Sequence, residues 1–457
     1  MKQIEQKRFE PVDASPVKAF FVSMLTRDIK LEEAILDLLD NSVDGVLRSR
    51  DRVNTRKPYD GFWAEITFNK DSFSISDNCG GIPWGLHEYA FRMGRMSHRP
   101  ADKAGTVGVY GIGMKRAIFK MGEHCLISTQ NGTEGYEIEI TPEWIKDEKE
   151  WHIPVTVAKR TMKEDGTTIY VGNLRSGIDT RFDENSESFS ADLKRMIATH
   201  YAFIIDKGFK VKVNGSTVEP YPTKLVYSEK RGGIKPFVFK TTTKDNVEVF
   251  LTVGFTRPIP SQDEVNNAQE EVRYSSLDAG WTVLCNDRAV LYCDRTEMTG
   301  WGEAGIPRYH TQFIAITGIV EFKSADASKL PTTTTKRGID ASSALYLQIK
   351  NKMREGMRIF VNYTNKWKGL PEESKKQIEE GKRLSFEEIK TETKNLVFTS
   401  TRSSIPPGDQ FKPVLPLPKR PEPCNRRISY LRDVDDVKIV SDFLFHNEDE
   451  DPSVVGG

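Results

Sequence analysis

The stretch ILDLLDNSVDG, Ile35 to Gly45, decides how the first part of this chain folds. Its apolar residues recur at spacings of three and four, the pattern of a helix that packs one face against a core. Asp37, Asn41 and Asp44 follow the same spacing, so a helix places all three on one face. The stretch predicts a buried helix with a polar side. Asp40 lies off that side, and we expect it in solvent.

These polar side chains suit the binding of a metal ion and a water molecule. Magnesium accepts an amide oxygen beside water and phosphate oxygens, which makes Asn41 a candidate ligand. The carboxylate of Asp37, one helical turn away, can orient a water molecule. A solvent-exposed stripe on an amphipathic helix is the alternative for this pattern taken alone.

The composition of the 457-residue chain is typical of a globular protein with two domains and a tail. Its 66 Lys and Arg balance its 66 Asp and Glu, so any basic surface for nucleic acid must be local. The five cysteines form no C-x-x-C pair, which argues against a zinc site or a disulfide framework. Without a signal peptide or a long apolar run, we expect a cytoplasmic protein with no membrane segment.

Periodicity predicts an α+β chain in which helices cover one face of a sheet. Helical spacing extends from Ser15 to about Arg50, and alternating strands such as GFWAEITF, GYEIEITP and GTTIYVGNL follow it. The pattern then restarts with a helix, with strands around an Asn214-Gly215 hairpin turn, and with a long helix from about Ser342 to Trp367.

We place the domain boundaries where this pattern restarts and where it ends. The first domain would comprise residues 1–175 and the second, smaller domain residues 176–370. Residues 371–457 would form a helical and proline-rich extension, partly disordered, because PPGDQFKPVLPLPKRPEP disfavours regular structure.

A glycine turn follows one strand of the first domain. In SDNCGGIP, Asp77 ends the strand, and Gly80 and Gly81 permit close approach of the backbone. A carboxylate held there can accept a hydrogen bond from an exocyclic amine such as that of adenine. A plain hairpin turn is the alternative.

A second glycine-rich segment, GTVGVYGIGMKRA, precedes a helix. Gly108, Gly111 and Gly113 of this segment lead into the helix. Bare amides and the positive end of the helix can receive phosphate there, and Lys115 adds charge. Further on, in DGTTIYV, Thr167 or Thr168 can place a hydroxyl near a base.

The four motifs in this order resemble the GHKL ATPases, which include gyrase B subunits, heat-shock chaperones, MutL and sensor histidine kinases. The resemblance implies a Bergerat ATP-binding sandwich that takes ATP and Mg²⁺. It implies that Asn41 binds magnesium, Asp77 binds the adenine amine, Gly81 lies beside the base and Thr167 reaches it through water. The loop 93–107 would be the ATP lid. The phosphates would be surrounded by Gly108, Val109, Tyr110, Gly111, Ile112, Gly113, Met114 and Lys115.

Two departures from the family pattern matter. Hydrolysing members usually carry glutamate four residues before the asparagine, where this chain has Asp37. The shorter carboxylate reaches the water only if its surroundings lie closer, so we expect an ATPase with Asp37 as a catalytic residue and slow turnover. Asp44 would support Asp37 and Asn41. Cys79 replaces a glycine of the family turn, and the adjacent Gly80 can supply the flexibility.

The second domain resembles the β-α transducer, a ribosomal S5 domain 2-like fold, of the gyrase, MutL and heat-shock branches. The resemblance implies a distant cation at the γ-phosphate, and KLPTTTTKRGID offers Lys336, with Lys329 and Arg337 as alternatives. Such a cation would neutralise charge in the transition state and tie domain closure to ATP. A solvated basic loop is the other interpretation.

The chain is most similar to MORC-type ATPases and their bacterial relatives, in GIVEF, in LPTTTTKRGID and in GWTVLCNDRAVL. That similarity implies a homodimeric clamp that closes on ATP and acts on DNA. The segment around the long helix is rich in basic residues, and Asp340 and Glu355 are its only acidic residues. The basic residues are Lys329, Lys336, Arg337, Lys350, Lys352, Arg354, Arg358, Lys366 and Lys368. The alternative function is a nucleotide-gated protein-interaction or chaperone-like platform with little hydrolysis.

Overall fold

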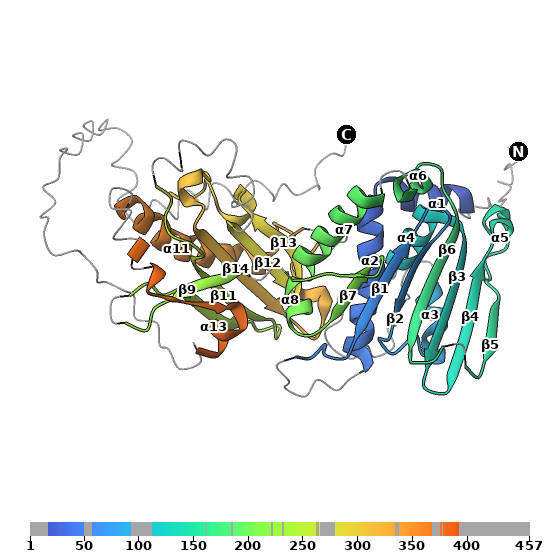
Figure 1. Cartoon of the computed structure of the whole chain (residues 1–457). Helices are drawn as coiled ribbons and strands as arrows, with labels where there is room; N and C mark the ends of the chain where they lie inside the picture. Colours follow the sequence, from blue (N-terminus) through green and yellow to red (C-terminus); the bar gives the residue numbers. More distant parts are fainter. Residues whose placement is uncertain are drawn as a thin grey trace, which may run out of the picture. The chain divides into compact units, whose positions relative to one another are not determined.

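Two large mixed sheets and a two-stranded ribbon organise the part of the chain that the computed structural model describes (Figure 1). All of the described residues belong to one compact unit, and the α+β class expected from the sequence is confirmed. The described residues are 17–49, 57–92, 112–160, 162–183, 186–220, 223–230, 233–261, 265, 279–333, 338–367, 375–376 and 378–392.

The first sheet has eight strands in the order β5-β4-β3-β6-β2-β1-β7-β8. Its strands are β1 (Trp63–Phe68), β2 (Phe73–Asp77), β3 (Gly122–Asn131), β4 (Glu134–Ile140), β5 (Val155–Ala158), β6 (Gly166–Leu174), β7 (Lys210–Val213) and β8 (Ser216–Thr217). Strands β1 and β2 bury alternate residues, so one face of the sheet is covered.

Helices cover that face and share one core with the sheet (Figure 1). They are α1 (Lys18–Arg27), α2 (Leu31–Ser49), α4 (Gly113–Met121), α6 (Ile178–Asp183) and α7 (Ser186–His200). The apolar residues of α2, among them Ile35, Leu38 and Leu39, are fully buried, which is why the opening stretch is helical. Short helices complete this half: η1 (Trp84–Leu86), α3 (His87–Phe91), α5 (Pro142–Lys146) and α8 (Ala202–Asp206).

The first sheet extends past residue 175, where we placed the first domain boundary. Strand β7 pairs in parallel with β1, and β8 turns back on β7. The turn between them is the Asn214-Gly215 hairpin expected from the sequence, and both residues have positive φ. The hairpin therefore belongs to the first sheet and not to the second.

The second sheet has five strands in the order β10-β11-β14-β12-β13. They are β10 (Phe237–Thr242), β11 (Glu248–Phe255), β12 (Gly280–Cys285), β13 (Arg288–Asp294) and β14 (Ile316–Lys323). Helix α11 (Ala344–Trp367) packs on one face, and α13 (Phe386–Glu392) packs on the other through Phe386 and Ile389. Three short 3-10 helices, η3 (Glu297–Thr299), η4 (Thr311–Phe313) and η5 (Ala327–Lys329), lie in the connections.

The start of the expected C-terminal extension folds back onto the second half. Strand β15 (Lys382–Ser385) pairs with β9 (Lys224–Tyr227) and leads directly into α13. Residues 393–457, which include the proline-rich stretch, lie outside the described residues. Among the described helices, none is long and apolar enough to span a membrane.

Candidate nucleotide site

Helix α2 presents the three polar residues that its spacing predicts. Asp37 and Asp44 are buried, and Asn41 is partly buried. The side-chain nitrogen of Asn41 is buried and has no hydrogen-bond partner among the described residues. A buried amide without a partner costs free energy, so a ligand that satisfies it would bind favourably here.

Our expectation for Asp40 was wrong. Its side chain is buried, with 1% exposed, and its carboxylate accepts hydrogen bonds from Tyr201 and Arg288. Helical periodicity correctly separates Asp40 from the polar side of α2, but it cannot tell that residues far along the chain cover the opposite side.

Helix α4 brings its first turn against Asp37. A Cβ added at Gly113 would lie 3.5 Å from Oδ2 of Asp37, so the start of α4 faces this carboxylate with room for no more than a small side chain between them. The N-cap residue Ile112 makes no side-chain capping bond, and the amides of the first turn have no acceptor within the helix. Met114 packs against the core and Lys115 is buried. This helix end can receive an anionic group.

Arg116 is a site residue that the sequence analysis missed. Its Nη2 lies 2.5 Å from Oδ2 of Asp37, and its Nε is buried with no hydrogen-bond partner in the part of the chain that the structure describes. The position directly after Lys115 in the glycine-rich motif was the available signal, because one helical turn separates it from Gly113. Arg116 therefore brings a cation from α4, whose N-terminal end is the candidate phosphate site, to the candidate water-orienting carboxylate of Asp37.

Asp77 ends β2 inside the fold, where three donors hold its carboxylate. Ser42 Oγ donates to Oδ2 at 2.7 Å, and the amides of Cys79 and Thr167 donate to Oδ1 at 2.9 Å and 3.3 Å. Burial raises the pKa of Asp77 because it removes water from the carboxylate, and these hydrogen bonds oppose the shift only in part. An acceptor that water cannot reach gains from a ligand donor such as an amine.

Strand register distinguishes Thr167 from Thr168. Asp77 lies directly opposite Thr167 on β6, and Thr167 lies directly opposite Thr129 on β3. Residues opposite one another share a face of the sheet, so the three side chains form a row. Thr168 belongs to the other face, where its hydroxyl lies 3.0 Å from that of Ser76. Thr167 is therefore the threonine beside Asp77.

The turn after Asp77 needs glycine for lack of space. Gly81 has a φ of +65°, and a Cβ there would clash with the carbonyl oxygen of Gln130. The next amide, of Ile82, donates to Thr129 Oγ1 at 2.8 Å, which ties the turn to the row. Cys79 is buried, and burial raises the pKa of its thiol well above the ordinary value, so it packs without thiolate chemistry.

Several predicted site residues lie outside the described residues. They are Gly108, Val109, Tyr110, Gly111 and Lys336, together with the loop 93–107 and Arg337. Of the three candidate γ-phosphate cations, the structure describes only Lys329. Its ammonium group donates to the carbonyl oxygen of Asp245 at 3.2 Å.

The described side chains fit a magnesium ion that is bound mainly by ligand and water. No group of three or more His, Cys, Asp or Glu that could hold a metal occurs among the described residues. Asn41 offers one amide with an unsatisfied nitrogen, so its oxygen and nitrogen can serve a metal and an anion together. Magnesium keeps several waters and takes few protein ligands when phosphate is present.

The comparisons with known proteins agree with this geometry. Residues 29–168 match the model of a family described as Histidine kinase-, DNA gyrase B-, and HSP90-like ATPase. The matched segment contains α2, the Asp77 turn, the described part of α4 and Thr167. A search of curated proteins found no match. The family match, together with the large sheet and its helices, supports the GHKL ATPase superfamily and ATP binding by this segment.

Proposed function

We propose that the chain binds ATP with Mg²⁺, hydrolyses the nucleotide slowly, and acts as an ATP-gated homodimeric clamp on DNA. The observation that carries the proposal is the placement of the start of α4, at Gly113, next to Asp37, within a segment that matches an ATPase family. This placement brings the N-terminal end of α4, which can hold phosphate, close to a carboxylate that can activate water.

Each described site residue has a task in the proposed reaction. Asp77 accepts a hydrogen bond from the adenine amine and Thr167 lies beside it, while the first turn of α4 binds phosphate. Asn41 holds magnesium, which when bound would neutralise phosphate charge. Asp37 orients the attacking water and accepts its proton.

Two features of Asp37 support slow hydrolysis. Its side chain is one methylene shorter than glutamate, although the close approach of α4 at Gly113 compensates for part of this difference. Its carboxylate also pairs with Arg116, so that pair must loosen before Oδ2 can accept a proton. Both features make proton transfer harder than in a site with a free glutamate.

The second sheet would act as the transducer that closes on ATP. Lys336 would reach the γ-phosphate from the loop between Thr333 and Gly338, whose backbones are hydrogen-bonded at 3.1 Å. Asp44, buried beside Asp37 and Asn41 on α2, would support both of them.

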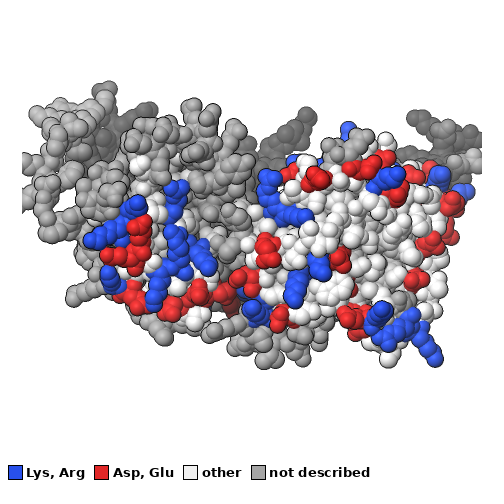
Figure 2. Space-filling model, in the orientation of Figure 1, with Lys and Arg blue, Asp and Glu red and all other residues white. Residues whose placement is uncertain are grey.

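Charge on the second half gives DNA binding limited support. Lys350 and Arg354 of α11 share Glu303, at 2.8 Å and 3.1 Å, and Lys352 pairs with Glu355. Figure 2 shows basic and acidic side chains interspersed on the visible face. The helix therefore offers phosphate fewer uncompensated cations than its sequence indicates.

A nucleotide-gated interaction platform is the second candidate function, and the Asp37–Arg116 pair favours it. Single-turnover measurement with excess protein discriminates between the two functions. A platform would dimerise and leave ATP intact, whereas a clamp that is reset by hydrolysis would convert ATP to ADP and phosphate.

The substitution Asp37→Ala tests the enzymatic part. We expect turnover to fall about 10²- to 10⁴-fold, the usual contribution of a general base, with ATP affinity retained. The isosteric Asp37→Asn is the control for side-chain shape and should lose turnover equally. Unchanged turnover in either variant would remove Asp37 as the base.

Duplex DNA across a salt series tests the target. Stimulation of ATP turnover that fades as salt rises supports a DNA clamp, because phosphate contacts release counterions. Turnover that is indifferent to DNA at every salt concentration contradicts the DNA target and favours a protein partner.

A further inference from the structure

We propose that Arg288, on the second sheet, is a positioning residue for the candidate ATP site on the first. This inference rests on the proposed function, because the residues that Arg288 would position are Asp37 and Asn41. It explains the NDR segment of GWTVLCNDRAVL, to which the proposed ATP chemistry gives no task.

The turn that carries Arg288 is firmly held. Asn286 and Asp287 connect β12 to β13 with φ angles of 50° and 70°, the left-handed conformation that a tight hairpin requires. The side-chain nitrogen of Asn286 donates to the backbone carbonyl oxygen of Ser324 at 3.1 Å. The side-chain oxygen of Asn286 accepts from the backbone amide of Ser324, also at 3.1 Å. Arg288 therefore starts from a fixed point at the end of the second sheet.

From this point Arg288 reaches Asp40 of α2. Its side chain is 1% exposed, and Nε donates to Oδ1 of Asp40 at 2.9 Å. Nη1 donates to the carbonyl oxygen of His200 at 3.2 Å, and the guanidinium lies over the ring of Tyr201, 4.1 Å from its centroid. These contacts hold the charge in one orientation.

Tyr201 adds a second hold on the same helix. Its hydroxyl lies 2.6 Å from Oδ1 of Asp40 and 2.8 Å from the carbonyl oxygen of Leu36. Arg288 and Tyr201 thus converge on one carboxylate oxygen that water does not reach. If Asp40 moved away, the buried guanidinium of Arg288 would lose its carboxylate partner, which costs free energy.

Helical geometry transmits this restraint to the nucleotide side. Asp40 is three residues after Asp37 and one before Asn41, and each residue turns the helix by a fixed angle. Holding Asp40 therefore sets the rotation and height of α2, and with them the direction of Asp37 and Asn41. The second sheet contributes to the site through α2 without touching the nucleotide.

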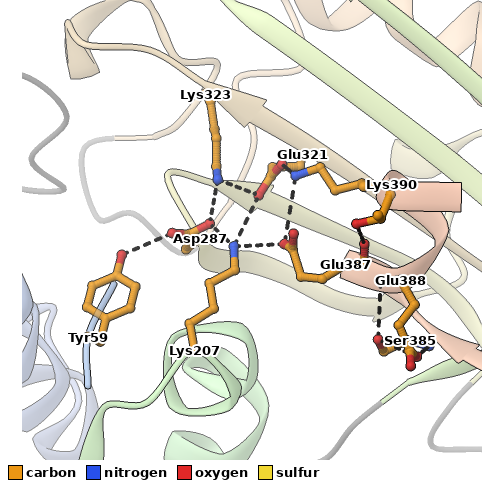
Figure 3. A network of polar contacts seen from close by, with 10 residues as sticks. Tyr59, Lys207, Asp287, Glu321, Lys323, Ser385, Glu387, Glu388 and Lys390 are labelled. Atoms are coloured by element: carbon orange, nitrogen blue, oxygen red, sulfur yellow. Dashed lines mark hydrogen bonds and ion pairs between the residues drawn. The ribbon is translucent and has the colours of Figure 1, made fainter. Parts of the chain in front are cut away.

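The neighbouring residue of the same turn provides a matched control. Asp287 accepts from Lys207 at 2.7 Å, and Lys207 also pairs with Glu387 of α13 at 2.9 Å (Figure 3). Lys207 is buried, and its ion pairs with Asp287 and Glu387 connect the turn to α13. Its removal disturbs a buried ion pair of the same turn while the hold on Asp40 stays in place.

The test compares Arg288→Met with Lys207→Met in the full chain, below the unfolding temperature of both. We expect Arg288→Met to lower kcat at least tenfold with ATP affinity changed less than about threefold, because small misplacement of a reacting group costs rate. Lys207→Met should keep kcat within about twofold. Arg288→Lys, which restores the charge without the planar fork, should recover part of kcat.

Amide hydrogen exchange on residues 35–45 without nucleotide separates this inference from the proposed function. Arg288→Met should speed exchange there more than Lys207→Met does, whether or not the wild-type chain turns over ATP. Equal exchange in the two variants would overturn the positioning role, and so would equal loss of kcat. A wild-type chain without ATP turnover would refute the enzymatic function alone.

Discussion

The two sides of α2 treat their polar groups differently. On the nucleotide side, neither the Asn41 nitrogen nor Nε of Arg116, the partner of Asp37, has a hydrogen-bond partner among the residues that the structure describes. On the opposite side, the Asp40 carboxylate accepts from both Tyr201 and Arg288. On α2, the side that packs against the second half therefore satisfies its buried carboxylate, whereas the candidate ligand side leaves buried donors for a ligand to satisfy.

The network around Asp287 shows how closely buried charges are paired in the second half (Figure 3). Its three cations face three carboxylates: Lys207, Lys323 and Lys390 against Asp287, Glu321 and Glu387. Burial alone would raise the pKa of Asp287, but Lys207 and Lys323 hold it well below its ordinary value. Burial alone would lower the pKa of Lys207, and the neighbouring carboxylates raise it instead.

Breaking the ion-pair network around Asp287 should have the largest effect. Asp287→Ala leaves Lys207 and Lys323 without their closest carboxylate, and removal of one partner of a buried pair costs about 3–5 kcal/mol of unfolding free energy. Urea unfolding measures this loss, and ATP affinity should stay unchanged. The control Glu229→Ala breaks an exposed pair with Lys382 and should leave the unfolding midpoint nearly unchanged. Equal unfolding midpoints for Asp287→Ala and Glu229→Ala would contradict the importance of the buried ion pairs.

Removing the side-chain amide of Asn41 should lower ATP affinity and leave stability intact, the opposite of the result expected for Asp287→Ala. Asn41→Ala should lower ATP affinity about 100-fold or more, which corresponds to about 2.7 kcal/mol. Stability should hold or rise, because the lost nitrogen has no partner and alanine favours a helix. Calorimetric titration with ATP and thermal unfolding measure the two quantities. Asn69→Ala, at an exposed turn, is the control for ATP affinity. A large loss of stability in Asn41→Ala would show that Asn41 serves the fold, and it would contradict the difference between the two sides of α2.

The smallest effect is a pH dependence at Asp77. Adenine needs an ionised acceptor, and the pKa of Asp77 is raised, so ATP affinity should fall about tenfold per pH unit once the pH drops below that raised pKa. The stability of the nucleotide-free protein depends on pH in the opposite direction. Because the pKa of Asp77 is raised by folding, protonated Asp77 favours the folded state, and this contribution is lost as the pH rises. Asp287, with its lowered pKa, contributes stability above the ordinary aspartate pKa that is lost as the pH falls.

Titration with ATP between mildly acidic and neutral pH checks the Asp77 dependence. Asp77→Asn should bind ATP weakly with a flat profile, since the amide does not titrate. A wild-type affinity that stays level until the ordinary aspartate pKa would rule out Asp77 as a buried acceptor.

Local pattern was sufficient for the elements and the candidate motifs. The spacing of three and four residues predicts α2 and its polar side, and alternation predicts β2 with Asp77 at its end. Alternation also separates Thr167 from Thr168, but only the pairing of β6 with β2 tells which of them faces the same way as Asp77. Arg116 directly follows Lys115 in the glycine-rich segment, and its partner became known only from the packing of α4 on α2.

By itself, the sequence determined the α+β class, the helix with Asp37 and Asn41 on one side, and the glycine turn after Asp77, because each depends on residues close together in the chain. Only the tertiary structure decided that β7 belongs to the first sheet and that Asp40 pairs with Arg288, 248 residues away. Such partners cannot be deduced from local spacing, since a buried charge is stabilised by whichever group the fold brings to it.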